Sequence, residues 1–172
     1  RFLSSAFTSS ERYATLLRYP AIAGRTLSLF ETSDYLTEIL VRHPEEIAAL
    51  NELNQGIRPL PSGVLFDATG GMARTVRDPV FEYLATSQSP HAEKISLLRR
   101  HYRRCMLLSG ARDVTQLRGV YESLAETTAA TEDAIGAALR IAEMPPGFAV
   151  MALGRLGSGE FDLLSDADLL FV

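Results

Sequence analysis

The residues most suited to chemistry are a group of glycines and a pair of aspartates near the end of the sequence. The apolar run FAVMAL leads into Gly154, Gly157, Ser158 and Gly159. A turn with so little side-chain bulk lets backbone N–H groups approach phosphate oxygens, and a short helix opening there would point its positive end at them. Ser158 adds a hydroxyl donor for a terminal phosphate. This pattern alone is weak, because glycine turns between strands and helices are common.

Two carboxylates follow the glycine turn. Asp166 and Asp168 are two residues apart at the start of a second apolar run, DLLFV. Residues i and i+2 of a strand project from one face, so both carboxylates can reach one point, where Mg²⁺ would offset their repulsion. A phosphate-binding turn beside such a pair indicates metal-dependent phosphoryl or nucleotidyl transfer. The competing interpretation is a capped turn before a strand, since aspartate is frequent in turns.

The elements that must position these residues are predicted to be mostly helices. One helix is expected to begin at Pro20, a second to have Ser33 as its N-cap, and a third to begin after His43 at Pro44. Glycines and prolines interrupt every periodicity over residues 54–78, which predicts a long loop.

Two longer helices are predicted after that loop. The first covers residues 90–109 and is expected to end at Gly110. Asp113 is expected to cap the longest helix, which runs to about Ala142. Apolar or small residues follow one another there at alternating steps of three and four, which predicts a packed helix in a bundle: Val114, Leu117, Tyr121, Leu124, Thr128, Thr131, Ile135, Ala138 and Ala142.

Composition excludes several classes of protein. The chain has 172 residues, of which 47% are hydrophobic and 22% charged, so a disordered chain is not expected. The net charge of −4 argues against a general nucleic-acid binder. One cysteine, Cys105, fits a reducing compartment, and without a long apolar run no membrane span is expected. A cytoplasmic location is the expectation.

The chemically informative segment resembles a known family. GRLGSGEFDLLSDADLLFV is similar to GKLGGRELNxSSDIDLIF of the glutamine synthetase adenylyltransferases, which have a polymerase-β-like nucleotidyltransferase fold. FETSDYLTEILVRHPEEIAAL resembles the helix pair of that family that ends in R-H-P-E. LRRHYRRCMLLSGARDV resembles its LRRFRRRELLRIAARDL helix. The resemblance extends from about Phe30 to the end.

The resemblance implies both a fold and an activity. The expected fold is mostly α, with a helical bundle domain over residues 1–146 and the first strands of an α/β nucleotidyltransferase domain over 147–172. The implied activity is transfer of AMP from ATP to a tyrosine of glutamine synthetase, or its phosphorolytic removal, with Mg²⁺ as cofactor. A PII-type signalling protein is a further implied partner. The alternatives are another nucleotidyltransferase, of the protein uridylyltransferase type, and a non-catalytic regulatory nucleotide-binding module.

The resemblance also assigns roles to residues. Gly157 and Ser158 match the phosphate-contacting turn, and Asp166 and Asp168 match the metal-binding, catalytic aspartates. The family has a third carboxylate on a later strand, so this sequence is expected to be a segment of a longer protein that is inactive alone. Four positions depart from the family pattern: Arg155, Gly159, Asp162 and Leu164.

Overall fold

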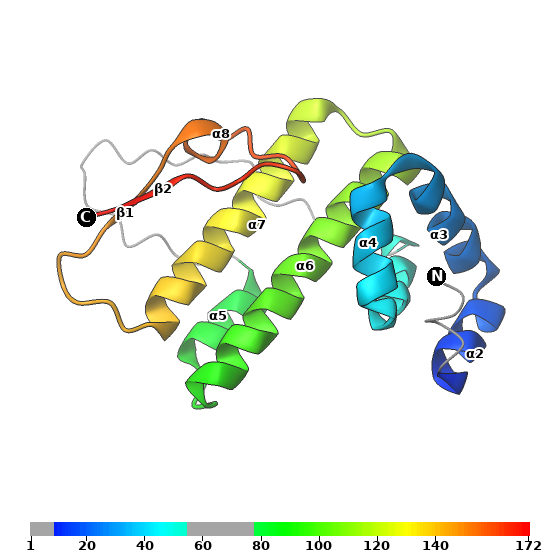
Figure 1. Cartoon of the computed structure of the whole chain (residues 1–172), viewed down its shortest axis with the longest axis horizontal. Coiled ribbons are helices and arrows are strands. Elements are labelled where there is room, and N and C mark those ends of the chain that lie inside the picture. Colours follow the sequence, from blue (N-terminus) through cyan, green and yellow to red (C-terminus); the bar gives the residue numbers. More distant parts are fainter. Residues whose placement is uncertain (1–8, 55–77) are drawn as a thin grey trace. The chain divides into compact units, whose positions relative to one another are not determined.

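The computed structural model of the protein describes residues 9–54 and 78–172. Within these ranges the chain is mostly helical and has one small two-stranded sheet, which confirms the predicted fold class (Figure 1). The chain forms two compact units, one of Arg1–Arg58 with Arg103–Ser123 and one of Pro59–Tyr102 with Leu124–Val172. No helix in the described ranges is long and apolar enough to cross a membrane.

The first unit begins with short helices, and several of them start where the sequence predicts. These are α2 (Ser10–Arg18), α3 (Pro20–Thr32), α4 (Asp34–Arg42) and the 3-10 helix η1 (Pro44–Asn54). Ser33 caps α4 as predicted, because its hydroxyl accepts a hydrogen bond from Leu36 N–H at 3.3 Å. Its own N–H donates to Leu29 O at 2.9 Å and so closes α3. The 3-10 winding of η1 was not indicated by the sequence, and runs of this length are uncommon.

A single apolar core holds this unit together. Arg25 adds a polar link, because its Nη1 donates to Leu50 O at 2.7 Å. The buried core side chains come from α3, α4, η1 and the second half of α6 (His91–Gln116): Ile22, Leu29, Leu36, Ile39, Leu40, Ile47, Ala49, Leu50, Leu53, Leu107, Leu108 and Ala111.

The predicted boundary at Gly110 is wrong. Helix α6 runs through it, and Asp113 lies inside this helix instead of capping the next one. A glycine in a helix interior costs about 1 kcal/mol relative to alanine. Residues 106–111 are all buried, and burying this turn outweighs the glycine penalty. The predicted loop over 54–78 lies almost entirely outside the described residues.

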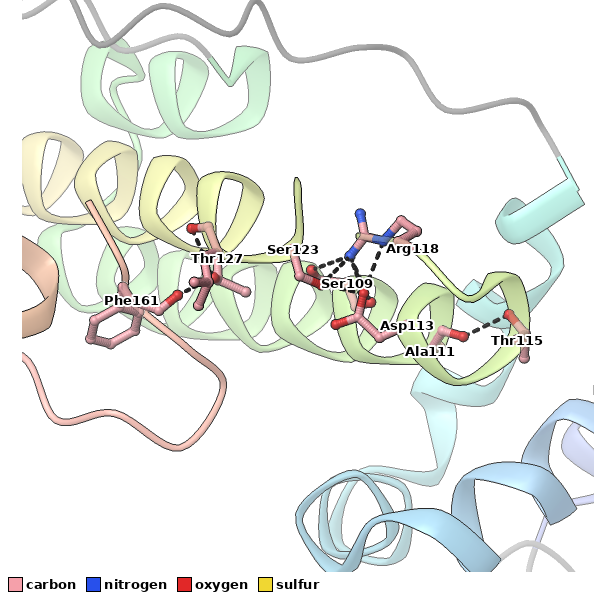
Figure 2. Close-up of polar contacts among 9 residues, drawn as sticks. Ser109, Ala111, Asp113, Thr115, Arg118, Ser123, Thr127 and Phe161 are labelled. Carbon is pink, nitrogen blue, oxygen red and sulfur yellow. Dashed lines mark hydrogen bonds and ion pairs between the residues drawn. The ribbon is translucent and has the colours of Figure 1, made fainter. Parts of the chain in front are cut away.

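Arg118 joins the end of α6 to the start of α7 (Val120–Ile141). Its side chain is only 4% exposed, and its Nη2 donates to Asp113 Oδ1 at 2.6 Å, Ser109 O at 3.1 Å and Ser123 Oγ at 3.1 Å (Figure 2). Ser123 Oγ also donates to Asp113. The helix break at Leu117, with φ of 50°, brings Arg118 back over α6. A buried guanidinium requires such partners.

The second unit contains α5 (Pro79–Thr86), the first part of α6, most of α7, β1 (Val150–Ala152), α8 (Gly154–Gly157) and β2 (Leu169–Phe171). Asp78 caps α5, because its Oδ1 accepts from Val80 N–H at 2.8 Å and Phe81 N–H at 3.2 Å. The same oxygen lies 3.0 Å from His101 Nε2 on α6, and the backbone N–H of Asp78 donates to Asp133 Oδ2 at 2.9 Å on α7. Asp78 therefore ties three helices together.

The predicted stripe along α7 holds only in part. Thr128 and Thr131 are buried, but Leu117 is 90% exposed and Tyr121 is 83% exposed. Helix α6 ends at Gln116 and α7 begins at Val120. Positions before and after this interruption therefore do not share one helix face. The buried residues of α7 are Thr127, Thr128, Thr131, Asp133, Ala134, Ala137 and Ile141.

Replacing Arg118 by methionine should lower the free energy of unfolding by about 2 kcal/mol, because Asp113 and Ser109 lose their charged partner. Urea denaturation of the 172-residue chain measures this. Arg42→Met is the matched control: Arg42 pairs with Glu38 across one turn of α4, and the side chains are 70% and 57% exposed, so almost no effect is expected. An equal loss of unfolding free energy in Arg118→Met and Arg42→Met would contradict the stabilising role of Arg118.

Stability should also depend on the charge of Asp78. Burial raises the pKa of its carboxyl, but the hydrogen bond and charge of His101 and the N–H groups of Phe81 and Val80 lower it more, so the pKa lies below its ordinary value. The stabilisation is therefore present above the unfolded pKa and is lost as the pH falls through the folded pKa. The wild-type chain should have a higher free energy of unfolding in urea than Asp78→Asn, and this difference should decrease as the pH falls from about 6 to about 3. A constant difference would contradict this.

Candidate functional site

The site residues predicted from the sequence lie on and beside a short antiparallel hairpin. Strands β1 and β2 pair in a register that places Val150 opposite Phe171. The pairing continues beyond the strands, because Leu153 N–H donates to Asp168 O at 2.9 Å. The glycine turn and Asp168 are therefore brought together by the backbone ladder and not by closeness in sequence.

Two glycines allow the turn to fold back on the hairpin. A Cβ on Gly157 would lie 2.4 Å from Ala152 O and 3.0 Å from Ala152 C, so only glycine fits there without a shift of backbone. Gly154 has φ of +54°, and a Cβ there would lie 3.2 Å from Asp168 Oδ2. The carboxylate of Asp168 therefore lies directly beside the first residue of α8. The space that a side chain would fill at Gly154 is left open next to this carboxylate.

The predicted phosphate-binding residues have their backbone donors in use. Gly157 N–H donates to Leu153 O at 3.0 Å, and Ser158 N–H donates to Gly154 O at 3.0 Å. The hydroxyl of Ser158 donates to Arg155 O at 3.1 Å and is on the surface. In any helix the first N–H groups have no partner within the helix, so the donors nearest a phosphate at this turn would be those at the start of α8. A phosphate contact by Gly157 and Ser158 stays a prediction.

Both predicted metal ligands are exposed. Asp166 and Asp168 precede β2, which begins at Leu169. The expectation that both belong to the strand is therefore wrong: the ladder extends to the carbonyl of Asp168, and Asp166 lies two residues further from the strand. Alternation along a strand does not apply to Asp166, and the convergence of the two carboxylates on one ion stays a prediction.

The loop between the turn and the aspartates is held by its own polar residues. Asp162 forms an ion pair with Arg155, its Oδ1 accepts from Leu164 N–H at 2.8 Å, and its N–H lies 3.4 Å from Ser165 Oγ. Arg155 and Asp162 are two of the positions that depart from the family pattern. The structure shows that the two residues contact each other, which their separate positions in the sequence did not indicate.

Two threonines of α7 are further site-associated residues that the sequence did not reveal. Phe161 N–H donates to Thr128 Oγ1 at 3.0 Å, and Thr127 Oγ1 donates to Phe161 O. Thr128 belongs to the predicted stripe, for which the sequence indicated only helix packing, and Thr127 was not part of that stripe. No sequence signal distinguishes a threonine that packs from one that binds a distant loop.

The carboxylates beside the glycine turn are ligands of the kind that a magnesium ion takes. Asp168 supplies an exposed carboxylate beside a cradle that a Cβ on Gly154 would fill. Mg²⁺ takes oxygen ligands and is commonly bound through one or two carboxylates and substrate phosphates. Asp166 and Asp168 would hold it.

Gly157→Ala should destabilise the hairpin by about 2 kcal/mol, because the new methyl group forces the turn away from Ala152. Amide hydrogen exchange of Leu153, whose N–H is bonded to Asp168 O, reports the change. Gly119→Ala is the control, since a Cβ there meets nothing within 4 Å. Unchanged amide exchange at Leu153 in Gly157→Ala would contradict the close approach of Gly157 to the carbonyl of Ala152.

Comparison with known proteins identifies the family. Residues 23–172 match the family described as "Glutamate-ammonia ligase adenylyltransferase". The chain is 32% identical, over its whole length, to the "Bifunctional glutamine synthetase adenylyltransferase/adenylyl-removing enzyme" of Cutibacterium acnes and 31% identical to that of Mycobacterium leprae. It spans 17% of the length of each of these relatives. No solved structure matches the chain. The chain therefore belongs to the glutamate-ammonia ligase adenylyltransferase family.

Proposed function

We propose that the protein carrying this chain transfers AMP from ATP to a tyrosine of glutamine synthetase, or removes it by phosphorolysis. The observation that carries the proposal is the position of the Asp168 carboxylate, 3.2 Å from where a Cβ on Gly154 would lie. A predicted metal ligand and a predicted phosphate-binding turn thus adjoin each other. The relatives' names supply the substrate protein, glutamine synthetase.

The residues of the chain have separate roles in this proposal. Asp166 and Asp168 bind Mg²⁺, and the turn containing Gly157 and Ser158 contacts the phosphates of ATP. When bound, Mg²⁺ would offset the charge that develops at the α-phosphorus and lower the pKa of the attacking hydroxyl. In the addition, the tyrosine hydroxyl displaces pyrophosphate from the α-phosphorus of ATP; in the phosphorolytic removal, phosphate displaces the tyrosine oxygen from that phosphorus. The roles given to these residues are the same whichever of the two activities this site has.

The remaining parts of the proposal rest on the family. We place the start of the nucleotidyltransferase domain near Gly147, after a helical domain over residues 1–146. A third carboxylate would come from a later strand of the complete protein, so the 172 residues alone should turn over weakly or not at all. A PII-type signalling protein is the proposed regulatory partner, and the cytoplasm is the proposed location.

Asp166→Asn and Asp168→Asn should each lower AMP transfer by the complete protein about a hundredfold or more, since a metal contributes several kcal/mol to the transition state. The assay follows labelled AMP from ATP to glutamine synthetase at a range of Mg²⁺ concentrations. Asp162→Asn is the matched control: it keeps an acceptor in the same loop and should change the rate only a few-fold.

Two results would redirect the proposal. Transfer from UTP but not ATP would favour a protein uridylyltransferase. Mg²⁺-dependent nucleotide binding without any transfer would favour a regulatory module. Full activity of both aspartate variants would contradict a metal role for this pair.

A further inference from the structure

We infer that Thr127 and Thr128 of α7 are positioning residues for the site, because their hydroxyls hold the backbone of Phe161 between the glycine turn and the aspartates. The inference rests on the proposed function for its catalytic consequence. Phe161 lies between Gly159, at the end of the turn, and Asp166, the first of the aspartates. Holding the backbone of Phe161 in place therefore restricts the positions of both the glycine turn and the aspartates.

Both backbone groups of Phe161 are satisfied by these two side chains. Its N–H donates to Thr128 Oγ1 at 3.0 Å, and its carbonyl accepts from Thr127 Oγ1 (Figure 2 shows Thr127 and Phe161). Thr127 is 2% exposed, Thr128 6% and Phe161 4%. Water cannot readily replace bonds at so buried a position, so loss of either hydroxyl leaves a backbone group without a partner.

Threonines elsewhere in the described helices bond to their own helix. Thr115 Oγ1 donates to Ala111 O at 2.7 Å (Figure 2), and Thr26 Oγ1 donates to Ile22 O at 2.8 Å. This back-bonding is the usual behaviour of threonine within a helix. Thr127 Oγ1 likewise lies 3.2 Å from Leu124 O, yet it also reaches the carbonyl of Phe161, 34 residues away.

A chain of hydrogen bonds fixes Thr127 in turn. Thr131 Oγ1 donates to Thr127 O at 2.8 Å. Because this uses the only proton of the Thr131 hydroxyl, Tyr102 must be the donor in its 3.0 Å contact with Thr131 Oγ1. Tyr102 belongs to α6, so the loop is tied through α7 to a second helix of the same unit.

The glycine turn precedes Phe161 in the chain, and the loop that leads to the aspartates follows it. On one side Glu160 N–H donates to Arg155 O at 2.8 Å and closes the glycine turn. On the other side Asp162 and Ser165 order the loop that leads to Asp166. Releasing Phe161 would let the turn and the aspartates shift relative to each other. A shift of about 1 Å in a reacting geometry can cost about a hundredfold in rate.

The test replaces each threonine by valine, which has nearly the same shape but no hydroxyl. Amide hydrogen exchange over residues 160–168 of the 172-residue chain should become about tenfold faster or more in Thr127→Val and Thr128→Val. Thr127→Ser and Thr128→Ser should restore slow exchange. Thr115→Val, which removes a hydroxyl that donates within its own helix, should leave exchange over these residues unchanged. Thr127→Ala and Thr128→Ala replace the valine variants if those do not fold.

The same variants in the complete protein test the catalytic consequence. Both valine variants should lower kcat for AMP transfer about tenfold or more, with rescue by serine. Unchanged exchange in the valine variants overturns the positioning role whether or not the protein transfers AMP. Faster exchange with wild-type kcat also overturns the positioning role and leaves the proposed function intact. A wild-type protein that transfers no AMP overturns the proposed function and, with it, the catalytic role of the threonines.

Discussion

The absence of two side chains, at Gly154 and Gly157, decides how the glycine turn folds. Gly157 approaches the carbonyl of Ala152 so closely that a Cβ would lie 2.4 Å from the oxygen. Gly154 adopts a positive φ and leaves room for the carboxylate of Asp168. A Cβ at Gly157 would push the turn away from the hairpin backbone, whereas a Cβ at Gly154 would be strained by the positive φ and would crowd the Asp168 carboxylate. The adjacency of turn and carboxylate, on which the proposed chemistry depends, follows from this constraint.

The helices of the second unit both stabilise the hairpin and fix the position of its loop. A two-stranded hairpin is marginally stable by itself, and the buried side chains of Leu156 and Phe161 anchor this one. Thr127 and Thr128 add specific hydrogen bonds to the backbone of Phe161. Packing supplies stability, whereas the hydrogen bonds fix one position of the loop along α7.

Local signals in the sequence predicted local structure well. The cap at Ser33, the start of α3 at Pro20 and the mostly helical class were all confirmed. The end at Gly110 was wrong because tertiary burial outweighed a local helix-ending signal. The contacts that join distant parts of the chain could not be predicted, since they depend on where separate elements pack: Asp78 with Asp133, and the two threonines with Phe161.

Paramagnetic Mn²⁺ in place of Mg²⁺ distinguishes one metal–nucleotide site, shared by the glycine turn and the aspartates, from two unconnected features. In the 172-residue chain with ATP, Mn²⁺ should broaden the amide resonances of residues 154–159 and 166–169 together, at the same metal concentration. Asp168→Asn should weaken both effects equally. Broadening of residues 166–169 that leaves the glycine turn unaffected, or broadening centred elsewhere, would contradict a shared site.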